Sequence, residues 1–252
     1  MTRYPLALAL LVLLPAAASA ESVLFLNFDG GAFSKGNCDD ARSNCSSLVA
    51  FDGIVVPAFD AAAYGPRVRV VNRITAAVAA AFAGTGVRVV STRPRAGEYH
   101  MIVVGGKALD VLGLWVLGRS GVGCGNANKN ATGFVTPFFD GRSDSPLAFD
   151  WRRPTEPFLS LVPHQPNEWH ESEAGIVRAI AHEAGHTYGL VHTMGFSASN
   201  PTPADIMCEE GPCRTGGPTT FKRVLMTTDR SQGSCGGETQ DSFHTLQQNV
   251  NN

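Results

Sequence analysis

Residues 173–192 read EAGIVRAIAHEAGHTYGLVH, and this stretch decides how the rest of the chain is interpreted. Its apolar residues recur at the spacing of a helix face that packs on a core. The shared face contains Ile176, Ile180 and Ala184. Ser172, just before the stretch, is a favourable N-cap because its hydroxyl can accept a hydrogen bond from the first turn. We therefore predict a helix from Glu173 to Tyr188.

His182 and His186 stand four residues apart in the predicted helix. Residues at this spacing differ by about 40° in direction and about 6 Å along the axis, so both imidazoles project from one face. Two imidazoles placed in this way can bind one metal ion at about 2.0–2.1 Å, the usual distance for zinc. These two histidines are therefore predicted metal ligands.

A third histidine, His192, follows six residues after His186. In a continued helix it would lie about 100° away in azimuth and about 9 Å further along the axis, out of reach of the same ion. The chain must therefore leave the helix between these residues and turn back. Gly189 stands where this turn is needed, since glycine adopts the left-handed conformation that ends a helix at little cost. We predict that His192 completes a three-histidine site.

Glu183 follows the first histidine and is expected to point alongside the metal instead of at it. Three neutral imidazoles leave a bound zinc ion dipositive, with one position open for a water whose pKa falls towards about 7. Glu183 would accept the proton of this water as it attacks a peptide carbonyl, and would deliver it to the leaving amine. The sequence thus predicts one catalytic zinc ion with Glu183 as the catalytic base.

The pattern His-Glu-x-x-His-x-x-Gly-x-x-His at residues 182–192 resembles the signature of the metzincin family of zinc endopeptidases. That family has a methionine-containing turn downstream of the signature. Met207 is the candidate for this Met-turn, 15 residues after His192, and the resemblance implies that it forms a hydrophobic floor beneath the metal. The implied fold is α+β and zincin-like: a mixed twisted sheet with the active-site helix, and a small irregular C-terminal subdomain.

The resemblance also implies a domain organisation and an activity. We expect one catalytic domain over residues 21–252, with an upper part over about 21–189 and a lower part over about 190–252. The implied protein is a monomeric, secreted zinc metalloendopeptidase that hydrolyses internal bonds of protein or peptide substrates. Two alternatives stay open: a zinc-binding protein that recognises a partner without cleaving it, and a zinc hydrolase with a non-protein substrate. Glu183 argues against the first, because a structural zinc site has four protein ligands and no use for a free carboxylate.

The branch of the metzincin family stays open between matrixin-like and adamalysin-like features. Ser234-Cys235 and the following Asp241-Ser242-Phe243 resemble the closing helix of the adamalysin branch. Glu209, two places after Met207, excludes the extra tyrosine ligand of astacin-like and serralysin-like members. The cysteine-switch motif of matrixin pro-segments is missing, and Thr193 after the third ligand matches no branch-defining residue.

The first 20 residues have the pattern of a secretory signal peptide. Arg3 supplies the positive charge, residues 5–14 are almost wholly apolar, and Ala18-Ser19-Ala20 gives the small-residue cleavage pattern. The apolar run is shorter than the roughly 20 residues that a membrane-spanning helix needs. We therefore expect a soluble protein that is extracellular, or periplasmic in a Gram-negative source. A formal net charge of −2 offers no basic surface for nucleic acid.

An exported chain makes disulfides the natural interpretation of its six cysteines. Short separations favour Cys38–Cys45 and Cys208–Cys213, which leaves Cys124–Cys235 as a long-range link. The resemblance to the adamalysin branch favours this last pair as well, because a comparable cysteine there bridges to one ahead of the active helix. Six cysteines permit many other pairings, so the connectivity is not fixed by the sequence.

Elsewhere, apolar runs predict strands at residues 23–28, 87–91, 99–104 and 133–139, with Pro137 confining the last one to a sheet edge. Helical periodicity predicts a helix over residues 68–82 and a short closing helix near Phe243. Two segments are interpreted as irregular, residues 32–66 and the long loop 140–172.

Calcium is possible but unsupported as a second metal. Asp29, Asp39 and Asp40 could contribute oxygen ligands, but they lack the spacing of an EF-hand. An acidic solvated loop is the favoured interpretation of these three residues.

Overall fold

A mixed sheet of five strands lies at the centre of the fold, with the two long helices on one face. The computed structural model describes residues 21–139, 169–194, 205–208, 220–228, 235 and 237–252. The strands of this sheet are β1 (Ser22–Asn27), β6 (Val87–Val90), β7 (His100–Val104), β8 (Gly118–Ser120) and β9 (Thr132–Val135). The described helices are α1 (Arg67–Ala81), α2 (Ala108–Leu112), α3 (Glu173–Thr187), α4 (Ser242–Val250) and the 3₁₀ turn η1 (Cys124–Asn126).

The strand order of the main sheet is β6-β1-β7-β9-β8. β1 pairs in parallel with β6 and β7, and β7 pairs in parallel with β9, whereas β8 runs antiparallel to β9 at the edge. The interior strands β1 and β7 are covered on both faces, which explains their nearly continuous apolar sequences. The strands predicted at residues 23–28, 87–91 and 99–104 are confirmed, and so is the α+β class with a mixed sheet.

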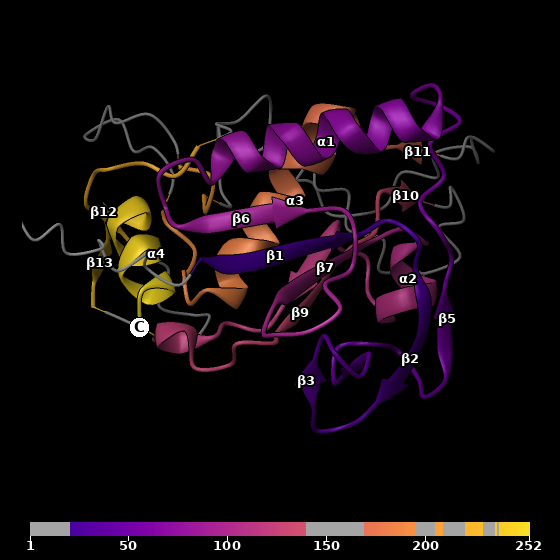
Figure 1. Cartoon of the computed structure of the whole chain (residues 1–252), viewed down its shortest axis with the longest axis horizontal. Coiled ribbons are helices and arrows are strands. Elements are labelled where there is room, and N and C mark those ends of the chain that lie inside the picture. The colour runs from indigo at the N-terminus through magenta and orange to yellow at the C-terminus, as the bar shows by residue number, and fades with distance from the viewer. Residues whose placement is uncertain (1–20, 140–168, 195–204, 209–219, 229–234, 236) are drawn as a thin grey trace, which may run out of the picture.

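The helices α1 and α3 pack on one face of this sheet (Figure 1). The predicted apolar face of α3 is wholly buried there: Ile176, Ile180 and Ala184 are each 0% exposed. Both helices begin and end within one residue of their predicted bounds, and α4 accounts for the predicted closing helix. Because α3 also crosses β7, β8 and β9, the histidine-bearing helix is fixed against the edge of the sheet.

The other face of the main sheet packs against a smaller sheet built from the segment that we expected to be irregular. Its order is β3-β4-β2-β5. The strands are β2 (Gly31–Lys35), β3 (Asp39–Asp40), β4 (Cys45–Ser46) and β5 (Ile54–Val56). The prediction of an irregular segment is therefore wrong for the four strands up to Val56 and holds for residues 57–66. These strands are too short to show a periodic pattern, and their hydrogen bonds join residues that the local sequence does not relate.

The strand predicted at residues 133–139 is also corrected. β9 ends at Val135 and lies inside the sheet between β7 and β8, so it is not an edge strand. Pro137 follows the end of β9, where it removes no hydrogen bond from the ladder. Beyond it, β10 (Phe138–Phe139) pairs with β11 (Trp169–His170), and the predicted long loop between them lies outside the described residues up to residue 168.

The C-terminal part contains α4 and one small hairpin of β12 (Met226–Thr227) and β13 (Thr239–Gln240). A disulfide joins Cys124 in η1 to Cys235 across 111 residues, and a second joins Cys38 to Cys45. Both predicted pairs are therefore confirmed. Cys208 is also disulfide-bonded, but Cys213, its predicted partner, lies outside the described residues.

The described helices include none that is both long enough and apolar enough to cross a membrane. The signal peptide predicted at residues 1–20 lies outside the described residues.

Candidate metal centre

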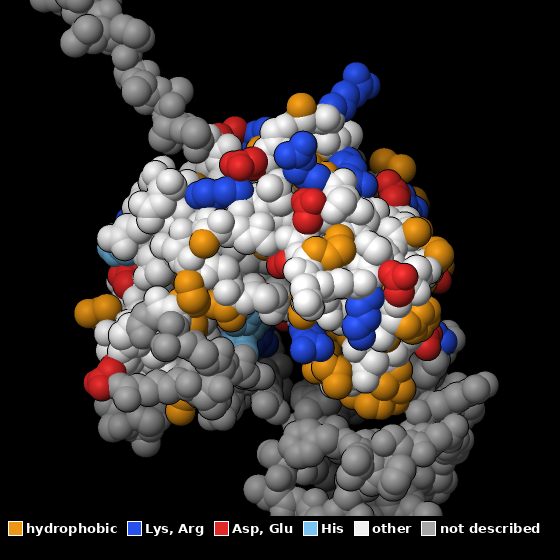
Figure 2. All heavy atoms as spheres, turned by 90° about the horizontal axis from the view of Figure 1, so that it is seen from below, with side chains coloured by type: hydrophobic (Ala, Val, Ile, Leu, Met, Phe, Trp, Pro, Cys, Tyr) orange, Lys and Arg blue, Asp and Glu red, His pale blue; other side chains and the backbone are white. Residues whose placement is uncertain are grey.

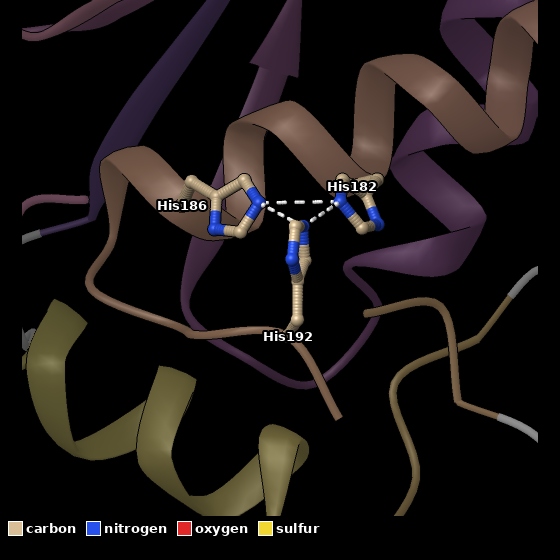
Figure 3. Close-up of side chains that lie close together, drawn as sticks. All are labelled: His182, His186 and His192. Atoms are coloured by element: carbon tan, nitrogen blue, oxygen red, sulfur yellow. Dashed lines mark hydrogen bonds between the residues drawn. The ribbon is translucent and has the colours of Figure 1, made fainter. Parts of the chain in front are cut away.

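The helix α3 carries the first two histidines, and Ser172 caps its N-terminus. The Ser172 hydroxyl, at the predicted N-cap, accepts a hydrogen bond of 3.0 Å from the Gly175 amide. Such a cap satisfies one of the amide groups that the first turn leaves without a helical partner. His182 and His186 lie one turn apart further along the helix and project from the same side, as their spacing predicts (Figure 3).

Gly189 ends the helix and turns the chain back. Its φ is +91°, a conformation that residues with a Cβ rarely adopt. A Cβ at this position would also lie 2.7 Å from the Gly123 carbonyl oxygen. The returning segment is then held by Gln240, whose side chain accepts a hydrogen bond from the Val191 amide at 2.9 Å and donates one to the Val191 carbonyl at 3.0 Å. The next residue, His192, is thereby brought back to the helix.

The three imidazoles meet at their Nε2 atoms (Figure 3). His192 Nε2 lies 2.9 Å from Nε2 of both His182 and His186, and these two lie 3.2 Å from each other. Ligand atoms about 2.0–2.1 Å from one tetrahedral zinc ion would lie about 3.3 Å apart. The nearly equilateral triangle therefore fits a single cation of this size. Three histidines are positioned to bind a metal ion.

The other ring nitrogens show which atoms carry the protons. His182 Nδ1 donates to the Ile206 carbonyl at 2.9 Å, and His186 Nδ1 donates to the Leu190 carbonyl at 2.8 Å. A neutral imidazole has one N–H, so both Nε2 atoms point lone pairs at each other. Burial, followed by the neighbouring imidazoles, holds the pKa of His182 well below its usual value. A shared cation would stabilise these facing lone pairs of His182 and His186.

Met207 lies against the same helix. It is wholly buried, and a Cβ added to Gly185 would lie 2.5 Å from its sulfur, so the missing side chain at Gly185 makes room for it. Asp205 holds this turn, because its carboxylate accepts hydrogen bonds from the amides of Met207 at 2.8 Å and Lys222 at 2.6 Å. Burial raises the pKa of Asp205. The turn also contributes the Ile206 carbonyl that orients His182.

Glu183 is 7% exposed and lies against β8. One of its carboxylate oxygens, Oε2, accepts a hydrogen bond of 2.6 Å from the Ser120 hydroxyl. Gly118, two residues earlier on the strand, lies so close that a Cβ there would stand 2.6 Å from Cγ of Glu183. A buried carboxylate next to a metal ligand is thus held by the edge strand of the sheet.

The sequence does not reveal several of these neighbours. Ser120, Gly118 and the carbonyls of Leu190 and Ile206 reach the site only through the packing of the chain. The sequence gives an indication only for the Ile206 carbonyl. Because Met207 is predicted to lie near the metal, its neighbour Ile206 must lie near it as well.

The aspartates considered for calcium do not converge. Asp29 pairs with Arg67, Asp39 accepts a hydrogen bond from the Thr132 amide, and Asp40 accepts one from Ser43. Among the described residues, the three histidines are the one group of three or more side chains with metal-ligating atoms in mutual reach.

Histidine side chains, pale blue in Figure 2, are visible beside a hollow in the face shown there. Acidic and basic side chains are interspersed over the rest of this face (Figure 2). His182 is partly exposed, whereas His186 and His192 are buried, so solvent reaches the trio through His182.

No family model matches this chain, and no curated protein matches it either. The described residues establish a trio of histidines, two from a helix and one from the segment after it, positioned to bind a metal ion. The nature of that ion and of any reaction has to be inferred from the chemistry of the donor atoms and of Glu183.

Proposed function

We propose that this protein is a secreted zinc-dependent endopeptidase of the metzincin type. His182, His186 and His192 would hold the zinc ion, and Glu183 would act as general base. The observation that carries the proposal is the triangle of three Nε2 atoms, with sides of 2.9 to 3.2 Å, beside a buried carboxylate from the same helix. The mixed sheet, the histidine-bearing helix and the methionine packed beneath it support the resemblance to metzincins.

Zinc is the metal that this donor set favours. Imidazole nitrogens suit zinc, copper, iron and nickel, whereas calcium and magnesium prefer oxygen ligands. Three histidines with an open position form a catalytic zinc arrangement, while structural zinc sites use four protein ligands. When bound, the metal would polarise the substrate carbonyl and lower the pKa of water.

Residues of the chain would orient the metal ligands and transfer the proton. Ile206 and Leu190 accept the Nδ1 protons of two ligands, which keeps the Nε2 lone pairs aimed at the metal and raises ligand basicity. The Glu183 carboxylate would take a proton from the attacking water and pass it to the leaving amine nitrogen. The water oxygen would form a bond to the carbonyl carbon, and the amide C–N bond would then break. The products are a carboxylate and an amine that carries the transferred proton.

The position of β8 supports a polypeptide substrate. Among the described strands, β8 pairs with β9 alone and forms the edge of the main sheet. Its Gly118 and Ser120 contact Glu183, so the strand passes beside the candidate centre. An exposed strand edge can pair with an extended peptide through main-chain hydrogen bonds. A bound peptide would then lie along the metal centre with its scissile bond accessible.

Secretion is proposed from the disulfides and the N-terminal sequence. Disulfides persist in oxidising compartments, and two are formed among the described residues, with a third through Cys208. We propose that residues 1–20 are removed on export and that residues 21–252 form one catalytic domain, extracellular or periplasmic.

The test is to express residues 21–252, load the protein with zinc, and assay unfolded protein substrates with and without a chelator. Glu183→Gln should abolish cleavage while zinc still binds, whereas Glu173→Gln in the first turn of the same helix should cleave normally. His192→Ala should lose both zinc and activity. Cleavage that survives chelation or Glu183→Gln would refute the mechanism. Stoichiometric zinc without any cleavage would instead favour a zinc-binding protein that recognises a partner.

A further inference from the structure

The strand β8 turns one face towards the histidine-bearing helix. Gly118 and Ser120 are two residues apart and therefore lie on the same face, while Arg119 between them is exposed. Both residues on the inner face touch the same side chain, Glu183. Gly118, which has no side chain, and the Ser120 hydroxyl therefore both face the Glu183 carboxylate.

The Ser120 hydroxyl has two acceptors within reach. Its oxygen lies 2.6 Å from Glu183 Oε2 and 2.9 Å from the Glu183 main-chain carbonyl oxygen. A hydroxyl has a single proton to donate. The distance of 2.6 Å lies in the range of about 2.5–2.7 Å that is typical of a bond from a hydroxyl to a carboxylate, so the proton is assigned to Glu183 Oε2.

Gly118 makes this arrangement sterically possible. A Cβ at this position would lie 2.6 Å from Glu183 Cγ, 2.7 Å from Oε1 and 2.9 Å from Cδ. Any other residue would therefore push the carboxylate away from the strand, or the strand away from the helix. The φ of Gly118 is not in the left-handed region, so the requirement for glycine comes from space and not from backbone conformation.

We propose that Ser120 is a positioning residue for Glu183, and that Gly118 provides the space in which it acts. This inference rests on the proposed function. A glutamate side chain has several rotatable bonds, and fixing it costs conformational entropy. The Ser120 hydroxyl fixes the carboxylate before substrate arrives, so that its oxygens stay aligned with the attacking water.

The experiment compares Ser120→Ala, Ser120→Thr and Thr136→Val in the zinc-loaded protein. Thr136→Val is the matched control, because it also removes a hydroxyl donor near β8, in a bond to the Val116 carbonyl, without touching Glu183. We expect Ser120→Ala to lower kcat by about 10- to 100-fold, as supporting residues around metal sites do, with KM changed by less than about 3-fold. Ser120→Thr keeps the hydroxyl and should restore kcat to within about 5-fold of the original.

Zinc affinity, measured by competition with a chelator, should be unchanged in all three variants, and Thr136→Val should keep its kcat. A Ser120→Ala variant with the original kcat would overturn the proposal. So would an equal loss of kcat in Thr136→Val, because the effect would then belong to the stability of the strand.

A structural measurement keeps the proposal testable if the protein cleaves nothing. Crystal structures of the zinc-loaded protein and of Ser120→Ala would be compared at Glu183. A carboxylate that is ordered against Ser120 and becomes displaced in the variant supports positioning even if the proposed function fails. A carboxylate that occupies the same place in both proteins refutes it whatever the activity.

Discussion

Acidification should destabilise this protein through His100, a residue far from the candidate metal centre in sequence. His100 is 1% exposed, donates its Nε2 proton to Asn126 Oδ1 at 2.9 Å and packs on the ring of Tyr188 at 4.2 Å between ring centroids. Burial lowers its pKa from 6.5 to about 4, and the hydrogen bond to Asn126 opposes this only in part.

The sign and size of the effect follow from this pKa. Between pH 6.5 and about 4 the unfolded chain binds a proton at His100 that the folded chain does not, so stability falls as the pH falls. Above pH 6.5 the contribution of the neutral imidazole is fully present. This difference between the pKa of His100 in the unfolded and the folded chain corresponds to about 3 kcal/mol in the free energy of unfolding. That contribution is lost by the time the pH reaches about 4.

Urea unfolding of the metal-free protein between pH 7.5 and pH 4 measures this contribution, with His100→Gln as the variant. Glutamine can keep a donor for Asn126 but cannot take up the proton. Between pH 7.5 and pH 4 the free energy of unfolding of the variant should therefore fall by about 3 kcal/mol less than that of the original protein. His244→Gln is the matched control, because His244 lies in α4 and is exposed, in an ion pair with Asp241. Parallel curves for the original protein and His100→Gln would refute the reasoning.

Three further perturbations test other parts of the structure. Gly189→Ala should destabilise the fold by about 1–3 kcal/mol, because φ is +91° and the new Cβ would meet Gly123; thermal unfolding and chelator competition should show reduced stability and weaker zinc binding together. Asp205→Ala should cost about 2–4 kcal/mol in urea unfolding, since two amide donors lose a buried acceptor, and an unchanged midpoint would contradict this role. Replacing both Cys124 and Cys235 by alanine opens a loop closed across 111 residues, and should cost about 4–5 kcal/mol in the same assay if loop entropy dominates.

The histidine-bearing helix could be predicted because its information is local. Helical periodicity gives α3 and its buried face, and the spacing of His182 and His186 gives the side on which they project. The need for a turn at Gly189 follows from the reach of His192 alone. Geometry of this kind depends on a few consecutive residues, and the sequence contains all of them.

The neighbours of the site could not be predicted, because they depend on contacts between distant segments. β8 has three residues and no alternating pattern, so neither the strand nor the contact of Ser120 with Glu183 is visible in the sequence. The small sheet over residues 31–56 was missed for the same reason. Pro137 led to a wrong edge assignment for β9, since its effect depends on whether the ladder has already ended.

The return of His192 to the helix depends on residues translated much later. The Gln240 side chain forms hydrogen bonds with both the amide and the carbonyl of Val191. Asn249 in α4 donates a hydrogen bond of 2.8 Å to the Tyr188 carbonyl, next to the turn at Gly189. A nascent polypeptide that ends before β13 has all three histidines but lacks both Gln240 and Asn249, which hold the returning segment. Assembly of the ion-binding trio would therefore lag behind synthesis of its own residues, until β13 and α4 have docked.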